Sequence, residues 1–249
     1  MLIGRGKREL VRKFMTTVGL RRRPRPDRGA QLLERYGIQV VLDVGANAGQ
    51  FAYSLWRVGY RGRIVSFEPL SSAFRELSTN ARGHRCWQTL NLALGDFDGE
   101  RTIHVAGNSE SSSLLEMLPR HVSAAPHSAY VGTEAVQVRR LDSIVDELIR
   151  PAERCFLKLD VQGFERSVLN GAGTCLPRFL GVQLEMSLVP LYGGEVLFQD
   201  MLAIMSEKGY CLMSLTDGFA EPKTGQVLQL DGVFYRRDLI ESVNDRVAS

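Results

Sequence analysis

The sequence has few cysteines and few histidines, four of each. The cysteines are Cys86, Cys155, Cys175 and Cys211. They are far apart and include no C-x-x-C pair, so we expect reduced thiols in the core of a cytoplasmic protein. The histidines lack the helical i, i+4 spacing and the cysteine partners of a zinc site. We therefore predict no metal ligands among these residues.

The chain also lacks a long apolar run. No stretch approaches the roughly 20 apolar residues that a transmembrane helix needs, and the N-terminal residues are charged where a signal peptide is apolar. We expect a protein that neither spans a membrane nor is secreted by that route. With 249 residues, of which 44% are hydrophobic and 24% charged, the chain is long enough to bury one sizeable core.

Charge is distributed unevenly along the chain. Residues 1–35 hold 11 Lys and Arg against 3 Asp and Glu, a net charge of +8, whereas residues 36–249 hold 20 against 25 and carry −5. Residues 7–20 place apolar side chains on one helical stripe, and Pro24 and Pro26 follow. We predict a basic amphipathic helix and linker in residues 1–35 and the main domain in residues 36–249.

Several roles stay open for residues 1–26. The apolar stripe can pack on the domain or pair with a second copy in a homodimer. Alternatively, the stripe and its cations suit peripheral docking on anionic lipid at the inner face of a membrane.

From Ile38 onward, short apolar runs alternate with amphipathic helical stretches. This pattern predicts an α/β fold with a doubly wound, mostly parallel sheet. The predicted strand and helix pairs are Ile38–Val44 with Gln50–Val58, Arg63–Phe67 with Ser71–Ala81, Cys155–Asp160 with Phe164–Ala172, and Leu180–Met186 with Glu195–Lys208. Thr102–Val105 predicts an extra strand, and Cys211–Leu215 with Gly232–Arg236 predicts a C-terminal antiparallel hairpin. Gly107–Tyr130 shows no sustained period and predicts a mobile substrate lid.

The most informative local pattern is a buried strand, a turn of small residues and a helix start within Val40–Phe51. Gly45 and Gly49 lack Cβ atoms where a ligand would approach the backbone, and Asn47 tolerates a left-handed conformation. Asn47 and Gln50 replace the second and third glycines of the G-x-G-x-x-G fingerprint, which makes a nicotinamide dinucleotide the weaker choice. The pattern predicts a nucleotide-like ligand at the carboxyl end of this strand.

An acid follows the next predicted strand, at Glu68 before Pro69. A carboxylate there can accept two hydrogen bonds from a ribose diol, and the proline fixes the turn. Any doubly wound domain needs a tight first turn and surface acids, but strand, turn, helix and acid in this order favour ligand binding.

A second cluster lies in Phe156–Glu165. Lys158 and Asp160 share one face of a predicted central strand, where unpaired charges would be costly, so we expect them to pair with each other or with a ligand. Gln183 and Glu185 repeat this arrangement on the next predicted strand, so two acids can face one cleft. A structural ion pair remains an alternative, as does a divalent cation held by Asp160 and Glu185 with substrate oxygens.

At these residues the chain resembles the FkbM family of S-adenosylmethionine-dependent methyltransferases. The resemblance covers roughly residues 36–237, and an ordered series of motifs is far more specific than one glycine turn. The matching stretches are Val41–Phe51, Phe67–Pro69, Leu92–Asp96, Arg140–Ser143, Leu157–Glu165, Leu188–Tyr192 and Gly232–Phe234. One departure is Gln162, where the family usually carries an acid.

The resemblance implies a seven-stranded sheet of the class I methyltransferase type, S-adenosylmethionine as the cofactor, and O-methylation of sugar or polyketide hydroxyls. Actinobacterial relatives look like enzymes that methylate deoxysugars of cell-envelope glycolipids, so the resemblance implies a small-molecule or lipid-linked sugar as the substrate. We predict no nucleic-acid partner. The alternatives are a nucleotide-binding enzyme of another class and a non-catalytic membrane-associated domain.

Methyl transfer to a hydroxyl needs in-line alignment and a general base but no covalent nucleophile. Asp160 is the predicted base, Glu185 its reserve, and Lys158 the residue that orients Asp160 or the developing oxyanion. The predicted cofactor-binding residues are Asp43, Gly45, Asn47, Gly49, Glu68 and Asp96. The position of Asp96 near the adenine edge rests on the resemblance alone.

Overall fold

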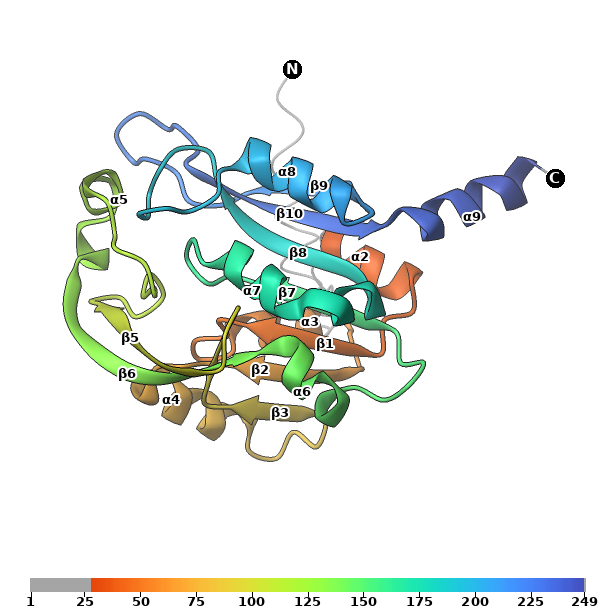
Figure 1. Cartoon of the computed structure of the whole chain (residues 1–249), viewed down its shortest axis with the longest axis horizontal. Helices are drawn as coiled ribbons and strands as arrows, with labels where there is room; N and C mark the ends of the chain where they lie inside the picture. Colours follow the sequence, from red (N-terminus) through yellow and green to blue (C-terminus); the bar gives the residue numbers. More distant parts are fainter. Residues whose placement is uncertain (1–27, 249) are drawn as a thin grey trace, which may run out of the picture.

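The computed structural model describes residues 28–248 (Figure 1). The helix predicted within residues 7–20 lies outside this part of the chain. The helices are α2 (Arg28–Arg35), α3 (Gln50–Val58), α4 (Ser71–Ala81), α5 (Pro119–Ala124), α6 (Leu141–Leu148), α7 (Glu165–Ala172), α8 (Phe198–Glu207) and α9 (Arg237–Ala248), with 3-10 helices η1 (Pro126–Ser128) and η2 (Gly173–Arg178). The strands are β1 (Val40–Val44), β2 (Arg63–Phe67), β3 (Trp87–Leu90), β4 (Ala93–Gly95), β5 (Gly99–Ala106), β6 (Tyr130–Arg140), β7 (Cys155–Leu159), β8 (Phe179–Ser187), β9 (Tyr210–Asp217) and β10 (Gln229–Arg236).

Seven strands form one sheet in the order β3-β2-β1-β7-β8-β10-β9. Neighbours from β3 to β8 are parallel, and β10 runs antiparallel to both β8 and β9. β1 and β7 lie side by side near the middle, with Asp43 paired to Lys158 in the register. The predicted architecture is confirmed: a doubly wound, mostly parallel seven-stranded sheet with a C-terminal antiparallel hairpin.

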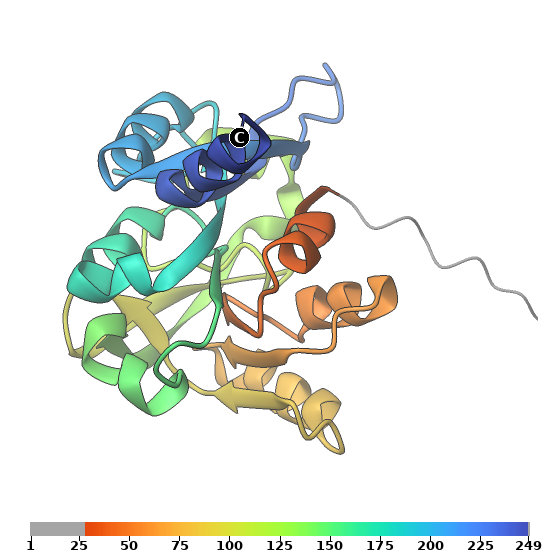
Figure 2. The same ribbon diagram turned by 90° about the vertical axis from the view of Figure 1, so that its right-hand side faces the viewer.

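Helices cover both faces of this sheet (Figure 2). α6, α7 and α8 lie on one face, and α2 and α3 lie on the other. Val40, Leu42 and Val44 of β1 belong to the larger hydrophobic core, whereas Val41 belongs to the core that includes Leu33 of α2. Because successive strand residues point to opposite faces, Asp43 points to the same side as Val41, beneath α3.

A smaller sheet, β4-β6-β5, was not predicted. Its β5 extends the predicted strand Thr102–Val105 at both ends and pairs antiparallel with β6. β6 has a weak strand signal in the sequence because Val136 and Val138 are its only fully buried apolar residues. Its place in a sheet depends on partners in β4 and β5 that lie 24 to 45 residues away, which local periodicity does not reveal.

The predicted lid, Gly107–Tyr130, contains α5 and η1 and folds against the turn after β1. Ser109 Oγ accepts a hydrogen bond from Asn47 Nδ2 at 2.9 Å, and Glu110 Oε1 accepts one from Gln50 Nε2 at 3.0 Å. The segment therefore covers the glycine turn, and its mobility stays a prediction.

Leu32 and Leu33 of α2 are buried in the core that includes Val41, and the division of the chain at residue 35 stays a prediction. The expectation for the cysteines needs a correction. Of the four free cysteines, two (Cys155 and Cys175) are buried as predicted. Cys86 is exposed because it precedes the edge strand β3, and Cys211 is only half-buried on edge strand β9.

Candidate active site

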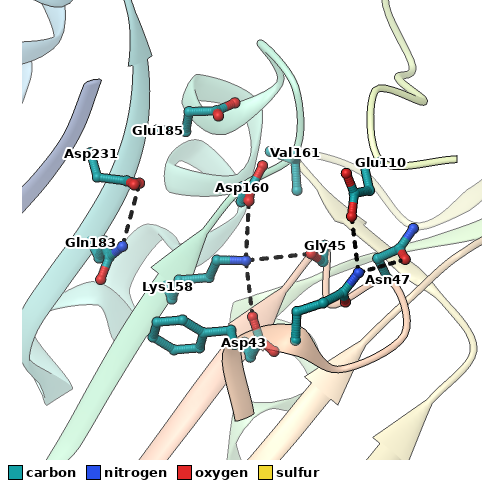
Figure 3. A network of polar contacts seen from close by, with 12 residues as sticks. Asp43, Gly45, Asn47, Glu110, Lys158, Asp160, Val161, Gln183, Glu185 and Asp231 are labelled. Carbon is teal, nitrogen blue, oxygen red and sulfur yellow. Dashed lines mark hydrogen bonds and ion pairs between the residues drawn. The ribbon is translucent and has the colours of Figure 1, made fainter. Parts of the chain in front are cut away.

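The turn after β1 contains three residues with left-handed backbone, Gly45 (φ 76°), Asn47 (φ 45°) and Gly49 (φ 94°). The conformation expected for Asn47 is confirmed, but the physical reason for the glycines is different. A Cβ on Gly45 would lie 1.8 Å from the carbonyl oxygen of Asp160, and one on Gly49 would lie 2.4 Å from the ring of Trp87. Close packing within the protein therefore demands these glycines, and it brings the turn directly against Asp160 (Figure 3).

Glu68 follows β2, and two backbone N–H groups hold its carboxylate. Oε2 accepts a hydrogen bond from Asn47 N at 2.8 Å, and Oε1 accepts one from Leu70 N at 2.9 Å. Burial raises the pKa of Glu68 from 4.5 to about 7, although both N–H donors act to lower it. The carboxyl group is thus fixed beside the glycine turn and changes its charge near neutral pH.

Lys158 of β7 is buried between two acids (Figure 3). Its Nζ lies 3.1 Å from Asp43 Oδ1 and 3.4 Å from Asp160 Oδ2, and it donates to the carbonyl oxygen of Gly45 at 3.4 Å. The ammonium also lies 5.3 Å from the ring centroid of Phe51 on α3. Burial alone lowers the pKa of Lys158, but the charges of Asp43 and Asp160 outweigh it and raise the pKa. The predicted pairing of Lys158 with Asp160 is confirmed.

Gln162 links the two predicted catalytic acids. Its Nε2 donates to Asp160 Oδ1 at 2.8 Å and to Glu185 Oε2 at 2.7 Å, while its Oε1 accepts a hydrogen bond from Tyr192 at 2.6 Å. Gln229 Nε2 donates to the same oxygen of Glu185 at 2.9 Å. Gln162 itself has a left-handed backbone, φ 54°, a conformation that surrounding contacts must stabilise.

The pKa of Glu185 is raised well above its ordinary value. Burial is the largest cause, and the nearby charges of Asp160, Glu165 and Asp231 act in the same direction. Glu165, in the first turn of α7, accepts hydrogen bonds from the backbone N–H groups of Val161 and Gly163 and so stabilises the turn after Asp160.

Two cavities meet at the end of β7. The first, here called the Glu68 cavity, has Glu68 in a wall of apolar side chains that include Phe67, Leu70, Leu92, Leu94 and Phe164. The second, the Glu185 cavity, has a volume of about 610 Å³, within the range of small-molecule sites. Its polar wall includes Gln50, Asn108, Gln183, Glu185, Gln229 and Asp231. Gly45, Asn47, Glu110, Asp160 and Gln162 line both cavities.

Three of the predicted cofactor-binding residues do not face these spaces. Asp43, Gly49 and Asp96 are not among the described residues that line either cavity. Asp43 is fully buried and holds Lys158 by an ion pair. The backbone carbonyl of Asp96 accepts a hydrogen bond from Arg140 at 3.1 Å. The structure thus brings together Gly45, Asn47, Glu68, Lys158, Asp160 and Glu185 of the predicted set.

Sequence reasoning overlooked the amide and aromatic part of the site. Gln162 was treated only as a departure from the family, and nothing local marks Tyr192, Gln229 or His121 as partners. Their contacts join residues between 30 and 98 positions apart, so the polar residue type at Gln162 was the one available signal.

Residues 28–248 contain no group of three or more His, Cys, Asp or Glu side chains arranged to hold a metal ion. In the same part of the chain, none of the helices has the length and apolar character needed to cross a membrane.

The methyltransferase FkbM domain matches residues 43–212. The 2-O-methyltransferase NoeI of Sinorhizobium fredii is 23% identical over 172 residues, which cover 67% of this chain and 70% of that protein. The AMB antimetabolite synthetase AmbE of Pseudomonas aeruginosa is 28% identical over 162 residues, which cover 53% of this chain and only 8% of that protein.

Two solved structures are also similar. A methyltransferase FkbM from Methylobacillus flagellatus has a TM-score of 0.46 and 16% identity, covering 78% of this chain and 43% of that chain. A 1,6-didemethyltoxoflavin-N1-methyltransferase from Burkholderia thailandensis, with bound S-adenosylhomocysteine, has a TM-score of 0.44 and 11% identity, covering 95% and 92%.

The domain match begins at Asp43 on β1, includes Glu68 and the Asp160 turn, and ends on β9, so it covers more than half of the sequence, the whole lining of the Glu68 cavity and most of the lining of the Glu185 cavity. The chain belongs to the FkbM family of methyltransferases.

Proposed function

We propose that this chain transfers a methyl group from S-adenosylmethionine to a hydroxyl oxygen of a sugar on a glycolipid or a related secondary metabolite. The observation that carries the proposal is the position of Asp160, which lines both the Glu68 cavity and the Glu185 cavity. A carboxylate at that junction can reach the acceptor where it meets the cofactor. The name of NoeI, a 2-O-methyltransferase, supports oxygen as the methylated atom.

The Glu68 cavity has the chemistry that S-adenosylmethionine requires. Glu68 would accept hydrogen bonds from the ribose hydroxyls, and the apolar side chains around Leu92 and Phe164 would contact the adenine. The cavity volume of about 50 Å³ is smaller than the cofactor, so the residues that cover the cavity would move apart to admit it. Gly45 and Asn47 would contact the part of the cofactor nearest to Asp160, because they line both cavities. When bound, the cofactor supplies an electrophilic methyl group on a positively charged sulfur.

Asp160 is the proposed general base. Its carboxylate would accept the proton of the acceptor hydroxyl as that oxygen becomes the nucleophile. Lys158 and Gln162 each contact one of its two oxygens, at 3.4 Å and 2.8 Å, and so fix the direction of the carboxylate. Glu185, which shares Gln162 with Asp160, is the reserve base.

The Glu185 cavity suits a polyhydroxylated acceptor. Side-chain amides such as Gln50, Asn108 and Gln229 offer both donors and acceptors, and the carboxyl groups of Glu185 and Asp231 offer further acceptors. Each sugar hydroxyl is itself a donor and an acceptor, so this mixture matches it better than a wall of one charge would.

The proposal extends to a lipid-linked acceptor reached from the cytoplasm at the inner face of a membrane. Residues 1–26, which would make the membrane contact or a homodimer, lie outside the described residues. Deleting them and measuring cosedimentation with anionic vesicles tests this extension. We expect the full chain to bind the vesicles in a salt-sensitive way and the truncated form to bind them less. Equal and salt-insensitive binding of both forms contradicts membrane docking, and loss of a dimer favours pairing of two copies.

Calorimetric titration tests the central proposal. S-adenosylmethionine should bind, whereas NAD and nucleotide sugars should not, which separates a methyltransferase from the other nucleotide-binding classes and from a non-catalytic domain. Methyl glycosides are then incubated with the protein and S-adenosylmethionine, and the products are analysed by mass spectrometry. A gain of one methyl group on oxygen supports the proposal. Binding of NAD or a nucleotide sugar in place of S-adenosylmethionine contradicts it.

A further inference from the structure

His121 lies on α5, within the segment that covers the glycine turn. Its side chain is buried, at 3% exposure, between two aromatic rings. The ring of Tyr192 meets it edge to face, with centroids 5.1 Å apart, and the ring of Phe219 lies 5.2 Å away at a tilt of 31°. Both His121 and Phe219 line the Glu185 cavity, which also exposes the proposed base Asp160.

The imidazole has an unused polar atom. Within residues 28–248, Nδ1 of His121 is buried and has no hydrogen-bond partner. Leaving a buried nitrogen unpaired is unfavourable, and native proteins do so chiefly where a ligand or water completes the bond. The ring forms part of the wall of the Glu185 cavity, so a ligand there that turns the ring slightly can supply the missing partner.

The charge state of the ring restricts that ligand. Burial lowers the pKa of His121 to about 4, so the imidazole is neutral at neutral pH. A neutral imidazole has one donor nitrogen and one acceptor nitrogen, which matches a hydroxyl group. It offers no positive charge to attract a carboxylate or a phosphate.

Tyr192 connects His121 to the proposed catalytic acids. Its ring fixes the orientation of His121, and its hydroxyl donates to Gln162, which holds Asp160 and Glu185. A sugar seated against His121 would therefore be positioned by the same framework that positions the proposed base.

We infer that His121 and Phe219 form an acceptor-recognition corner, in which a glycoside hydroxyl pairs with the imidazole and the C–H face of the sugar packs on the phenyl ring. This inference rests on the proposed function and specifies its acceptor site. His121 is a substrate-contacting residue, and Asp160 retains the role of base.

Three variants separate recognition from structure. His121→Phe keeps an aromatic ring but removes both nitrogens, and His121→Asn keeps a polar atom near the position of Nδ1. The matched control is His127→Phe, an exposed histidine of the neighbouring η1. All three are compared with the unaltered full chain by thermal unfolding and by titration with S-adenosylmethionine.

The acceptor probes are methyl hexopyranosides and methyl 6-deoxyhexopyranosides, tested by KM and kcat and by calorimetry on the complex with S-adenosylhomocysteine. We expect His121→Phe to raise the KM and the dissociation constant of the best glycoside at least tenfold, with a smaller change in kcat. His121→Asn should recover at least a third of the lost affinity, and His127→Phe should bind as the unaltered chain does. Cofactor affinity should stay within twofold in every variant.

Equal glycoside affinity in His121→Phe and the unaltered chain overturns the inference, and so does an equal loss of glycoside and cofactor affinity. In either case, methylation of a glycoside by the unaltered chain still supports the proposed function, so the two failures are distinguishable. If His121→Phe does not fold, the unaltered chain labelled with ¹⁵N-histidine gives the answer. The His121 Nδ1 resonance should shift on glycoside addition, and an unchanged resonance at saturation overturns the inference.

Discussion

Cofactor binding is expected to weaken as the pH falls below 7, and Glu68 is the cause. Its carboxylate has a pKa of about 7 because it is buried beside the glycine turn. Ribose hydroxyls donate to a carboxylate much better than to a protonated acid, so the proton competes with the cofactor for Glu68. The apparent dissociation constant therefore scales with the fraction of ionised Glu68.

The magnitude follows from that pKa. At pH 8 almost all of Glu68 is ionised, whereas at pH 6 about a tenth is, so affinity should fall about tenfold between pH 8 and pH 6, or about 1.4 kcal/mol. Below pH 6 the loss should approach a further factor of about ten per pH unit. Ordinary glutamates ionise near pH 4.5 and would give no slope in this range.

Calorimetry with S-adenosylhomocysteine from pH 6 to pH 8 measures this slope. Glu68→Gln removes the titrating group, so its affinity should be lower by about 1–3 kcal/mol at pH 8 and should vary far less with pH. The matched control is Glu76→Gln, an exposed residue of α4, which should retain the full slope. A slope that survives in Glu68→Gln, or an unchanged dissociation constant in that folded variant, would remove Glu68 from the cofactor site.

Three further substitutions test the network around β7. Asp160→Asn should keep cofactor affinity within twofold but lose at least about 100-fold in turnover, and wild-type turnover would pass the role of base to Glu185. Lys158→Met leaves Asp43 buried without its ion pair, so it should lower the free energy of unfolding in urea by about 3–5 kcal/mol. The double variant with Asp43→Asn should recover part of this loss, and a loss below about 1 kcal/mol in Lys158→Met would show that the ion pair does not stabilise the fold. Gln162→Glu replaces the donor to Asp160 and Glu185 with a third carboxyl group, so turnover should fall at least about tenfold and the pH–rate profile should move to higher pH. An unshifted pH–rate profile would show that Gln162 does not influence the ionisation of Asp160 and Glu185.

Much of the fold could be predicted because its signals are local. The strands β1, β2, β7 and β8 are short apolar runs, and the helix after each has an amphipathic period, so their alternation and the C-terminal hairpin were correct, whereas edge strand β3 was not predicted. The positions of Glu68 and Asp160 also follow from local patterns, since each residue directly follows a buried strand and the carboxyl ends of parallel strands share one edge of a sheet. β6 was missed because it has only two fully buried apolar residues and pairs with distant strands.

The sequence by itself determined which residue types stand at the carboxyl ends of β1, β2, β7 and β8, because hydrophobic period and turn chemistry are properties of neighbouring residues. Tertiary structure decided how those residues are used. Asp43 supports Lys158 from below and does not face a cavity, Gly45 is required by contact with Asp160, and Gln162 joins two acids from different strands. Apart from the Gln162–Asp160 hydrogen bond, these contacts join residues 23 or 115 positions apart in the sequence. Periodicity shows which face a side chain occupies, but only the packed chain determines which atoms it meets there.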